Sequence, residues 1–257
     1  RHSSRRRGRR ASSEVLTEQM ILRASRAGFS RLALLPLAAL VLAGCDSANP
    51  VDLPPAVHDP IIFVHGFNGS DKDFDEMRAR FEADGWRDGI ELFAFRYSST
   101  VTNAANAQAV RNHVNHVLSI TGARKVDIVS HEMGSLSSRF YIRHFGGIPH
   151  VDAWVSLGGP NHGTTEALKR CTFIPCQEMD VESAFITALN AEVEGPPPVR
   201  YATWRSPCDE VVVPRESVAV WDAENYITAC MPNAALVRNP AIYTQVREFV
   251  RKPHRIP

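Results

Sequence analysis

A short segment of mixed side chains, Ser-His-Glu-Met-Gly at residues 130–134, stands between an apolar run and a helical pattern. The run at 125–129 is typical of a buried strand, and residues 133–145 have the spacing of a helix. A sharp turn from strand to helix lifts its apical side chain clear of the sheet, and the helix start offers main-chain N–H groups. The apex is Glu132, so the segment predicts a carboxylate beside a group of N–H donors.

The rest of the chain alternates between the same two patterns. Strands are expected at residues 61–64, 91–97, 125–129, 153–157, 199–204 and 218–220, and helices at 71–83, 103–118, 133–145 and 240–250. Apolar strands that alternate with helices predict an α/β fold, with a mostly parallel central sheet and helices on both faces. The functional loops of such a sheet lie at the carboxyl ends of its strands.

Three further motifs follow expected strands. They are His-Gly-Phe at residues 65–67, Leu-Gly-Gly-Pro-Asn-His-Gly-Thr at 157–164 and Ser-Pro-Cys-Asp at 206–209. In this order, together with residues 130–134, they resemble the class 2 lipases, small lidless bacterial lipases of the α/β-hydrolase fold. The resemblance extends over about residues 59–252. It implies a minimal α/β-hydrolase domain, at 59–257, whose family hydrolyses carboxylic and lipid esters.

The resemblance assigns roles to five positions. Phe67 and Met133 match the residues whose main-chain N–H groups form the oxyanion hole, and Asp209 matches the acid of the catalytic triad. Glu132 stands at the position of the nucleophilic serine, and Asn233 stands at that of the catalytic histidine. The sequence therefore departs from the family at two residues that the family's reaction needs.

These two departures predict a protein that hydrolyses no ester. A carboxylate can act as a nucleophile, but the ester it forms is cleaved only when a base activates water, and the amide of Asn233 accepts no proton near neutral pH. We expect the Glu132 carboxylate instead to curl onto the N–H groups of Phe67 and Met133. Asn233 is expected at most to hydrogen-bond to Asp209.

Other nucleophiles and bases near these positions have simpler interpretations. Ser130 and Ser135 flank the apex and are expected to point away from it, and the side chain of His131 is expected to diverge. His162 is interpreted as a histidine that orders its loop, and His254 comes after the closing helix. None of these residues is expected to replace the nucleophilic serine or the catalytic histidine of the family.

Three functional hypotheses follow. The chain is a non-catalytic lipase-fold protein that binds a lipid or acyl-ester ligand, an active lipase or carboxylesterase with non-standard residues, or an interaction protein without a ligand. The missing serine and histidine favour the first over the second, and the remaining oxyanion loop favours the first over the third. The sequence is compatible with natural loss of the two residues and with deliberate change.

The first 44 residues have the features of an export signal. They hold nine arginines against two acidic residues, and their apolar stretch at 32–43 is too short to span a bilayer. Leu42-Ala43-Gly44-Cys45 resembles the lipobox of bacterial lipoproteins, which puts a lipid anchor on Cys45. The alternative is an ordinary signal peptide that ends near a cysteine. With the lipobox, residues 45–58 form a proline-rich tether, and the exported protein is held on a membrane, on its periplasmic or cell-surface side.

If Cys45 carries a lipid, four cysteines remain. We expect two local disulfides, Cys171 with Cys176 and Cys208 with Cys230. Metal binding is the alternative, but no histidine or further cysteine stands at ligand spacing beside either pair. No metal cluster or phosphate loop is evident in the sequence, so no cofactor is expected. The residues after 44 hold 20 basic against 26 acidic side chains, which argues against nucleic acid as the main partner.

Overall fold

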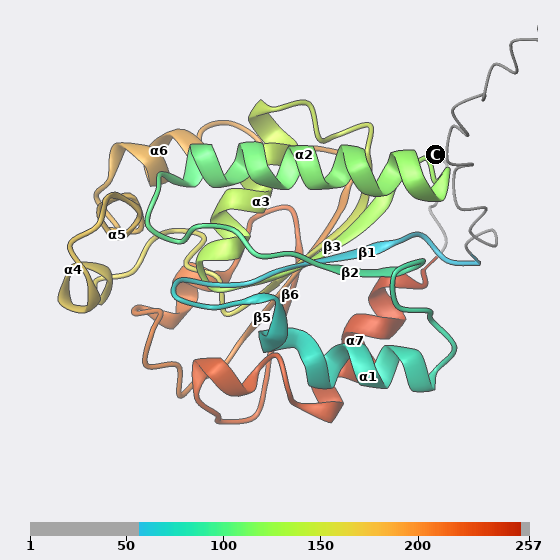
Figure 1. Cartoon of the computed structure of the whole chain (residues 1–257). Coiled ribbons are helices and arrows are strands. Elements are labelled where there is room, and N and C mark those ends of the chain that lie inside the picture. The colour runs from blue at the N-terminus through green and yellow to red at the C-terminus, as the bar shows by residue number, and fades with distance from the viewer. Residues whose placement is uncertain (1–56, 253–257) are drawn as a thin grey trace, which may run out of the picture. The chain divides into compact units, whose positions relative to one another are not determined.

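The computed structural model describes residues 57–252; the expected leader, nearly all of the tether with Cys45, and His254 lie outside this range. Its strands are β1 (Ile61–Val64), β2 (Leu92–Ala94), β3 (Val126–His131), β4 (Val151–Leu157), β5 (Arg200–Arg205) and β6 (Glu224–Ile227). They form one sheet in the order β2-β1-β3-β4-β5-β6, and every neighbouring pair is parallel. The expected α/β architecture is confirmed. Because the strands are parallel, the loops that follow them meet at one edge of the sheet (Figure 1).

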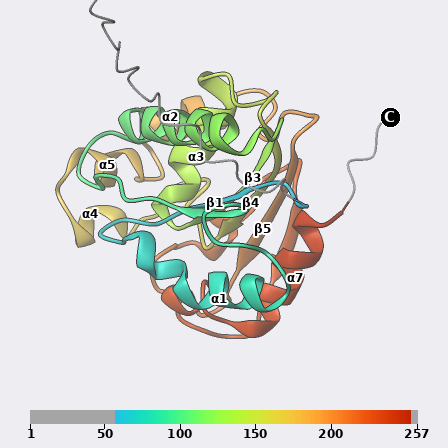
Figure 2. The ribbon, with the colours of Figure 1, turned by 45° about the vertical axis from the view of Figure 1, so that its right-hand side comes forward.

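Helices cover both faces of this sheet, as the views in Figure 1 and Figure 2 agree. One face packs against α1 (Asp75–Ala83), which continues a 3-10 turn at Asp71–Phe74, and against α7 (Pro240–Val250). The other face packs against α2 (Asn103–Thr121) and α3 (Met133–His144). The side chains of β1 alternate between the two, since Phe63 belongs to the first core and Ile62 to the second.

Two predicted strands differ from the structure. The strand expected at 91–97 is limited to β2, and the one expected at 218–220 is absent, because Val218 ends a 3-10 turn, Arg215–Val218. Val218 and Val220 are buried, so the apolar pattern of this segment reflects burial and not an extended backbone. The sequence also missed β6, an edge strand whose side chains are mostly exposed. Three short helices between β4 and β5 were missed as well: α4 (Ala167–Arg170), α5 (Ile174–Glu178) and α6 (Ala184–Leu189).

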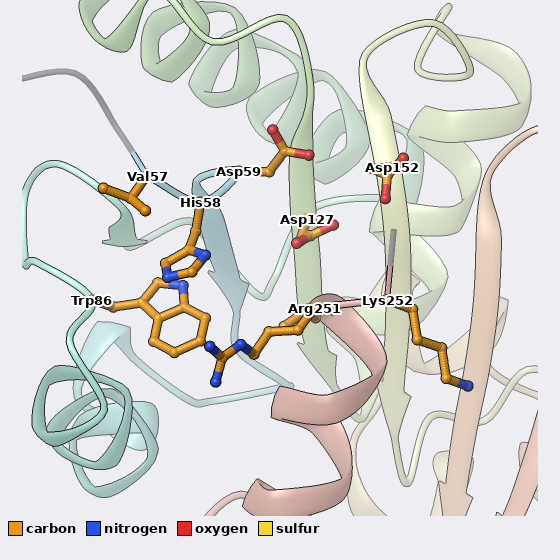
Figure 3. Close-up of a pocket in the computed structure, with 9 residues that line it drawn as sticks. Val57, His58, Asp59, Trp86, Asp127, Asp152, Arg251 and Lys252 are labelled. Carbon is orange, nitrogen blue, oxygen red and sulfur yellow. The ribbon is translucent and has the colours of Figure 1, made fainter. Parts of the chain in front are cut away.

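The amino ends of the strands hold a cavity of about 270 Å³ (Figure 3). The carboxyl groups of Asp59, Asp127 and Asp152 lie on one side of it. Arg200 pairs with Asp152 at 2.6 Å, whereas within residues 57–252 the Asp127 side chain accepts one hydrogen bond, from the main-chain N–H of Ala153 at 3.0 Å. Burial, reinforced by the two neighbouring carboxyl groups, raises the pKa of Asp127 well above its usual range. Ionisation of Asp127 therefore opposes folding.

Because ionisation of Asp127 opposes folding, Asp127→Asn is predicted to stabilise the protein at neutral pH. The amide oxygen can still accept the Ala153 N–H. The unfolded variant no longer gains the stabilisation that ionisation of this carboxyl gives the unfolded wild-type chain above about pH 4. We expect the melting temperature at pH 7 to rise by about 2–5 °C, and the gain to vanish near pH 3, where the carboxyl is protonated in both states. Calorimetry at both pH values measures this difference. Asp222→Asn, at an exposed carboxyl, is the control; a lower melting temperature of Asp127→Asn at pH 7 contradicts the account.

Candidate active site

Glu132 occupies the sharp turn between β3 and α3. Its backbone has a φ of 48° and a ψ of −126°, a left-handed conformation that is strained for a side chain other than glycine. The residue is buried, and its Oε2 accepts hydrogen bonds from the main-chain N–H groups of Phe67 and Met133, both at 2.6 Å. This is the contact that the sequence led us to expect. The catalytic roles of the three positions stay predictions.

Glycines on both sides of this carboxylate allow the close approach of the chain. A Cβ atom on Gly66 would lie 2.7 Å from Oε2 of Glu132, and one on Gly134 would lie 2.4 Å from the main-chain oxygen of His65. Any larger residue at either position would push the loop after β1 away from the turn after β3. The donor N–H of Phe67 would move with that loop.

Tyr97, which the sequence placed merely in a strand, holds the loop after β1. Its ring stacks on His65 at 4.1 Å, and its hydroxyl donates to the main-chain oxygen of His65. Burial, with a contribution from the charge of Glu132, raises the pKa of the Tyr97 phenol well above its usual value. Burial lowers the pKa of His65. Both groups therefore stay neutral, and they contribute packing and hydrogen bonds to the oxyanion loop.

Asp209 and Asn233 form a buried pair at the same edge of the sheet. Oδ1 of Asp209 accepts the N–H groups of Val211 and Val212, and its Oδ2 accepts the Asn233 amide Nδ2 at 2.7 Å. The same Nδ2 donates to the main-chain oxygen of Gly158 at 3.1 Å. The expected hydrogen bond between Asn233 and Asp209 is thus present, and the amide of Asn233 supplies no proton acceptor in the place of a histidine.

His131 connects this pair to the turn after β3. Its Nε2 lies 3.3 Å from the main-chain oxygen of Asn233, a contact that the sequence did not predict. The contact places the turn that carries Glu132 against the segment that carries Asn233. The His131 ring is nearly buried, and its nitrogens make no other hydrogen bond within residues 57–252.

The flanking hydroxyl groups lie inside the protein. The Ser130 hydroxyl donates to the main-chain oxygen of Val155 at 2.6 Å and lies 3.0 Å from the Ser135 hydroxyl oxygen, and neither serine is exposed. His162 bonds with Glu194 at 2.9 Å, away from the turn. Within residues 57–252, no group of three potential ligands is placed to hold a metal ion. No helix in the same range is long and apolar enough to cross a bilayer.

The four remaining cysteines form the expected local disulfides, Cys171–Cys176 and Cys208–Cys230. The second bond joins the loop after β5, next to Asp209, to the loop after β6, three residues before Asn233. It therefore ties together the two segments that carry the buried pair. The first bond closes the loop between α4 and α5.

The parallel sheet, the turn after β3 and the acid loop after β5 together define an α/β-hydrolase. A lipase from Bacillus licheniformis has the same fold, with a TM-score of 0.67 at 16% identity over 79% of this chain and 96% of that one. Lipase B from Aspergillus fumigatus is also similar, with a TM-score of 0.66 at 14% identity over 79% of this chain and 55% of that one.

Sequence comparison gives the family. The class 2 lipase family matches residues 58–236, and the chain belongs to it. A triacylglycerol lipase from Burkholderia plantarii is 30% identical over 150 residues, 55% of this chain and 41% of that protein. One from Pseudomonas fragi is 27% identical over 135 residues, 50% of this chain and 44% of that protein. The match thus spans less than half the length of either relative.

The Cys208–Cys230 bond predicts a redox-dependent stability. The bond closes a segment of 22 residues, so replacing both cysteines by serine should lower the free energy of unfolding by about 2–4 kcal/mol, mainly through a freer unfolded chain. Urea unfolding followed by tryptophan fluorescence measures the loss. The matched control replaces Cys171 and Cys176, where the separation of 5 residues predicts a smaller loss. Equal stability of the Cys208/Cys230 double variant and the parent would contradict this prediction.

Proposed function

We propose that this chain is a catalytically silent member of the lipase family, an exported protein that binds a lipid or acyl-ester ligand without cleaving it. The observation that carries the proposal is the Glu132 carboxylate, which accepts the N–H groups of both Phe67 and Met133. Hydrolysis by the family's route needs those two donors free to stabilise a tetrahedral oxyanion. An anion that belongs to the protein already uses them.

The missing base supports the same conclusion. Proton transfer needs a group that accepts a proton within hydrogen-bond reach of the nucleophile. Among the described residues, the Asn233 amide stands where the family has its histidine, and it donates to Asp209 and Gly158. His131 is the nearest imidazole on the chain, but its Nε2 contacts a main-chain oxygen of Asn233. These contacts favour a silent site over an active lipase with non-standard residues.

Apolar side chains beside the oxyanion loop favour an acyl ligand over an empty site. Phe67 lies 6.4 Å from Phe173, measured between ring centroids. Leu168, Phe173 and Ile174 are each about half exposed on the helices that the Cys171–Cys176 bond joins. An exposed apolar group of this kind offers a surface for a hydrocarbon chain. The two disulfides and the bacterial lipase relatives fit an exported protein.

Restoring the triad tests the proposal. The unaltered protein should release no p-nitrophenol from a short-chain p-nitrophenyl ester above the rate of a heat-denatured sample. Glu132→Ser alone should stay inactive because it lacks a base, and Asn233→His alone because it lacks a nucleophile. The double variant should be at least about 100-fold faster than either single variant, because the members of a triad act as a unit.

Two further variants make the outcome specific. Asp209→Asn added to the double variant should remove most of the gained rate, because Asp209 then no longer holds the new histidine in its productive orientation. Hydrolysis by the unaltered protein that Glu132→Ala abolishes would instead make Glu132 a nucleophile and end the proposal. Solvent extraction and mass spectrometry of the purified protein should identify a bound lipid or acyl ester; its absence would favour an interaction protein.

The lipobox makes a separate prediction about the membrane. Cys45→Ser should prevent lipidation, and the variant should move from the detergent phase to the aqueous phase in Triton X-114 partitioning, because it loses the acyl chains. Cys171→Ser, at another cysteine, is the control and should stay in the detergent phase. Mass spectrometry of the mature protein should identify Cys45 as the first residue. Any other first residue would contradict the lipoprotein assignment.

A further inference from the structure

A second cavity, of about 510 Å³, opens beside the turn Arg215–Val218 and shares no residue with the predicted catalytic positions. Pro214, Ala219 and Val220 form its apolar wall. A pocket of this size with an apolar wall and a few fixed polar groups is typical of a small-molecule site. Nothing in the proposed function uses this cavity.

Trp221 lies at this cavity with its side chain in the solvent. The residue is 83% exposed, the highest value among the large hydrophobic residues between 57 and 252. Its main chain is fixed, since its N–H donates to Oε2 of Glu194 at 2.9 Å. The next segment is fixed as well, because the Asn225 side chain accepts the Val220 N–H at 3.0 Å and donates to the Val220 oxygen at 2.9 Å. The main chain thus places an exposed indole at the cavity, where its flat face can contact a ligand.

His162 supplies the first polar group of the cavity. Its Nε2 lies 2.9 Å from Oε1 of Glu194. Burial raises the pKa of Glu194, but the hydrogen bonds from His162 and from the Trp221 main chain outweigh burial and bring the pKa below its usual value. The contact with Glu194 engages Nε2, and Nδ1 makes no hydrogen bond with residues 57–252, so Nδ1 is left to pair with a ligand hydroxyl.

Ser217 supplies the second polar group. The residue lines the cavity, is only 5% exposed, and its hydroxyl has no hydrogen-bond partner in the part of the chain that the structure describes. Its main chain is fixed, since its oxygen accepts the His162 N–H at 2.9 Å and its N–H donates to Pro214 at 3.1 Å. A hydroxyl that lines the cavity and bonds with no protein group in this range can pair with a ligand.

We propose that this cavity binds a sugar ring. A pyranose has one face of C–H groups, which fits the Trp221 indole and the apolar wall, and a rim of hydroxyl groups. One hydroxyl would hydrogen-bond with Nδ1 of His162, and another would pair with the hydroxyl of Ser217. A fatty chain would leave both polar groups without partners, and an anion would meet the carboxylate of Glu216 in the lining.

A free sugar and the terminal residue of a glycan both offer a pyranose ring with these features. Titration distinguishes the two sources. The full protein is titrated with methyl glucopyranoside, methyl galactopyranoside and N-acetylglucosamine, and with the corresponding oligosaccharides, by ligand-observed NMR and tryptophan fluorescence. Saturable binding of at least one sugar is expected, with a Kd of about 10 mM or tighter. A monosaccharide that binds as well as its oligosaccharide indicates a free sugar, and a much tighter oligosaccharide indicates a glycan end.

The variants then locate the binding. Trp221→Ala should weaken it at least about tenfold without lowering the melting temperature, because the indole is exposed. Ser217→Ala should weaken it about threefold to tenfold through the lost hydroxyl. Ile227→Ala removes another exposed apolar side chain, which is 65% exposed and outside the cavity, and should change nothing. Absence of binding by every sugar, unchanged affinity of Trp221→Ala, or tighter binding of octanoate at the same tryptophan would overturn the proposal.

Discussion

The Glu132 carboxylate accepts two main-chain hydrogen bonds, and the arrangement of the loops at the carboxyl ends of the strands depends on that contact. The left-handed backbone of Glu132 costs about 1–2 kcal/mol. A hydrogen bond to a charged group contributes about 1.5–3 kcal/mol, so two of them exceed the strain. The contact also requires a glycine at position 66, since a Cβ there would collide with the carboxylate. The glutamate thus stabilises the turn that it occupies.

The second replacement follows the same physical rule. Asp209 is fully buried, and a buried carboxylate is costly unless donors surround it. The Asn233 amide supplies a donor to Asp209 and another hydrogen bond to Gly158, so the pair needs no histidine for stability. The Cys208–Cys230 bond ties the two loops that carry the pair. Hydrogen bonds therefore fix the side chains of Glu132, Asp209 and Asn233, which is consistent with the proposal of a silent enzyme.

Much of this arrangement was predictable from the sequence, because it follows from local patterns. Apolar runs predicted β1, β3, β4 and β5, and a strand directly followed by a helix predicted the turn at Glu132. The spacing of the cysteines predicted both disulfides. The failures have several causes. Buried valines made residues 218–220 look like a strand, α4–α6 are too short for a clear helical period, and tertiary contacts leave no periodic signal. The exposed edge strand β6 lacks an apolar run, and the stacking of Tyr97 on His65 joins residues 32 apart in the sequence. The contact of His131 with Asn233 likewise joins distant segments.

The most direct test of the account is the amide NMR signals of Phe67 and Met133 in the ¹⁵N-labelled protein. Two short hydrogen bonds to a carboxylate should shift both amide protons strongly downfield and slow their exchange with solvent. In Glu132→Ala both signals should move upfield and exchange faster. The amide of Asn103, which donates to Glu178 at 2.6 Å, is an internal reference that should keep its position. If the Phe67 and Met133 signals stay where they are in Glu132→Ala, the carboxylate does not occupy these donors and the account is wrong.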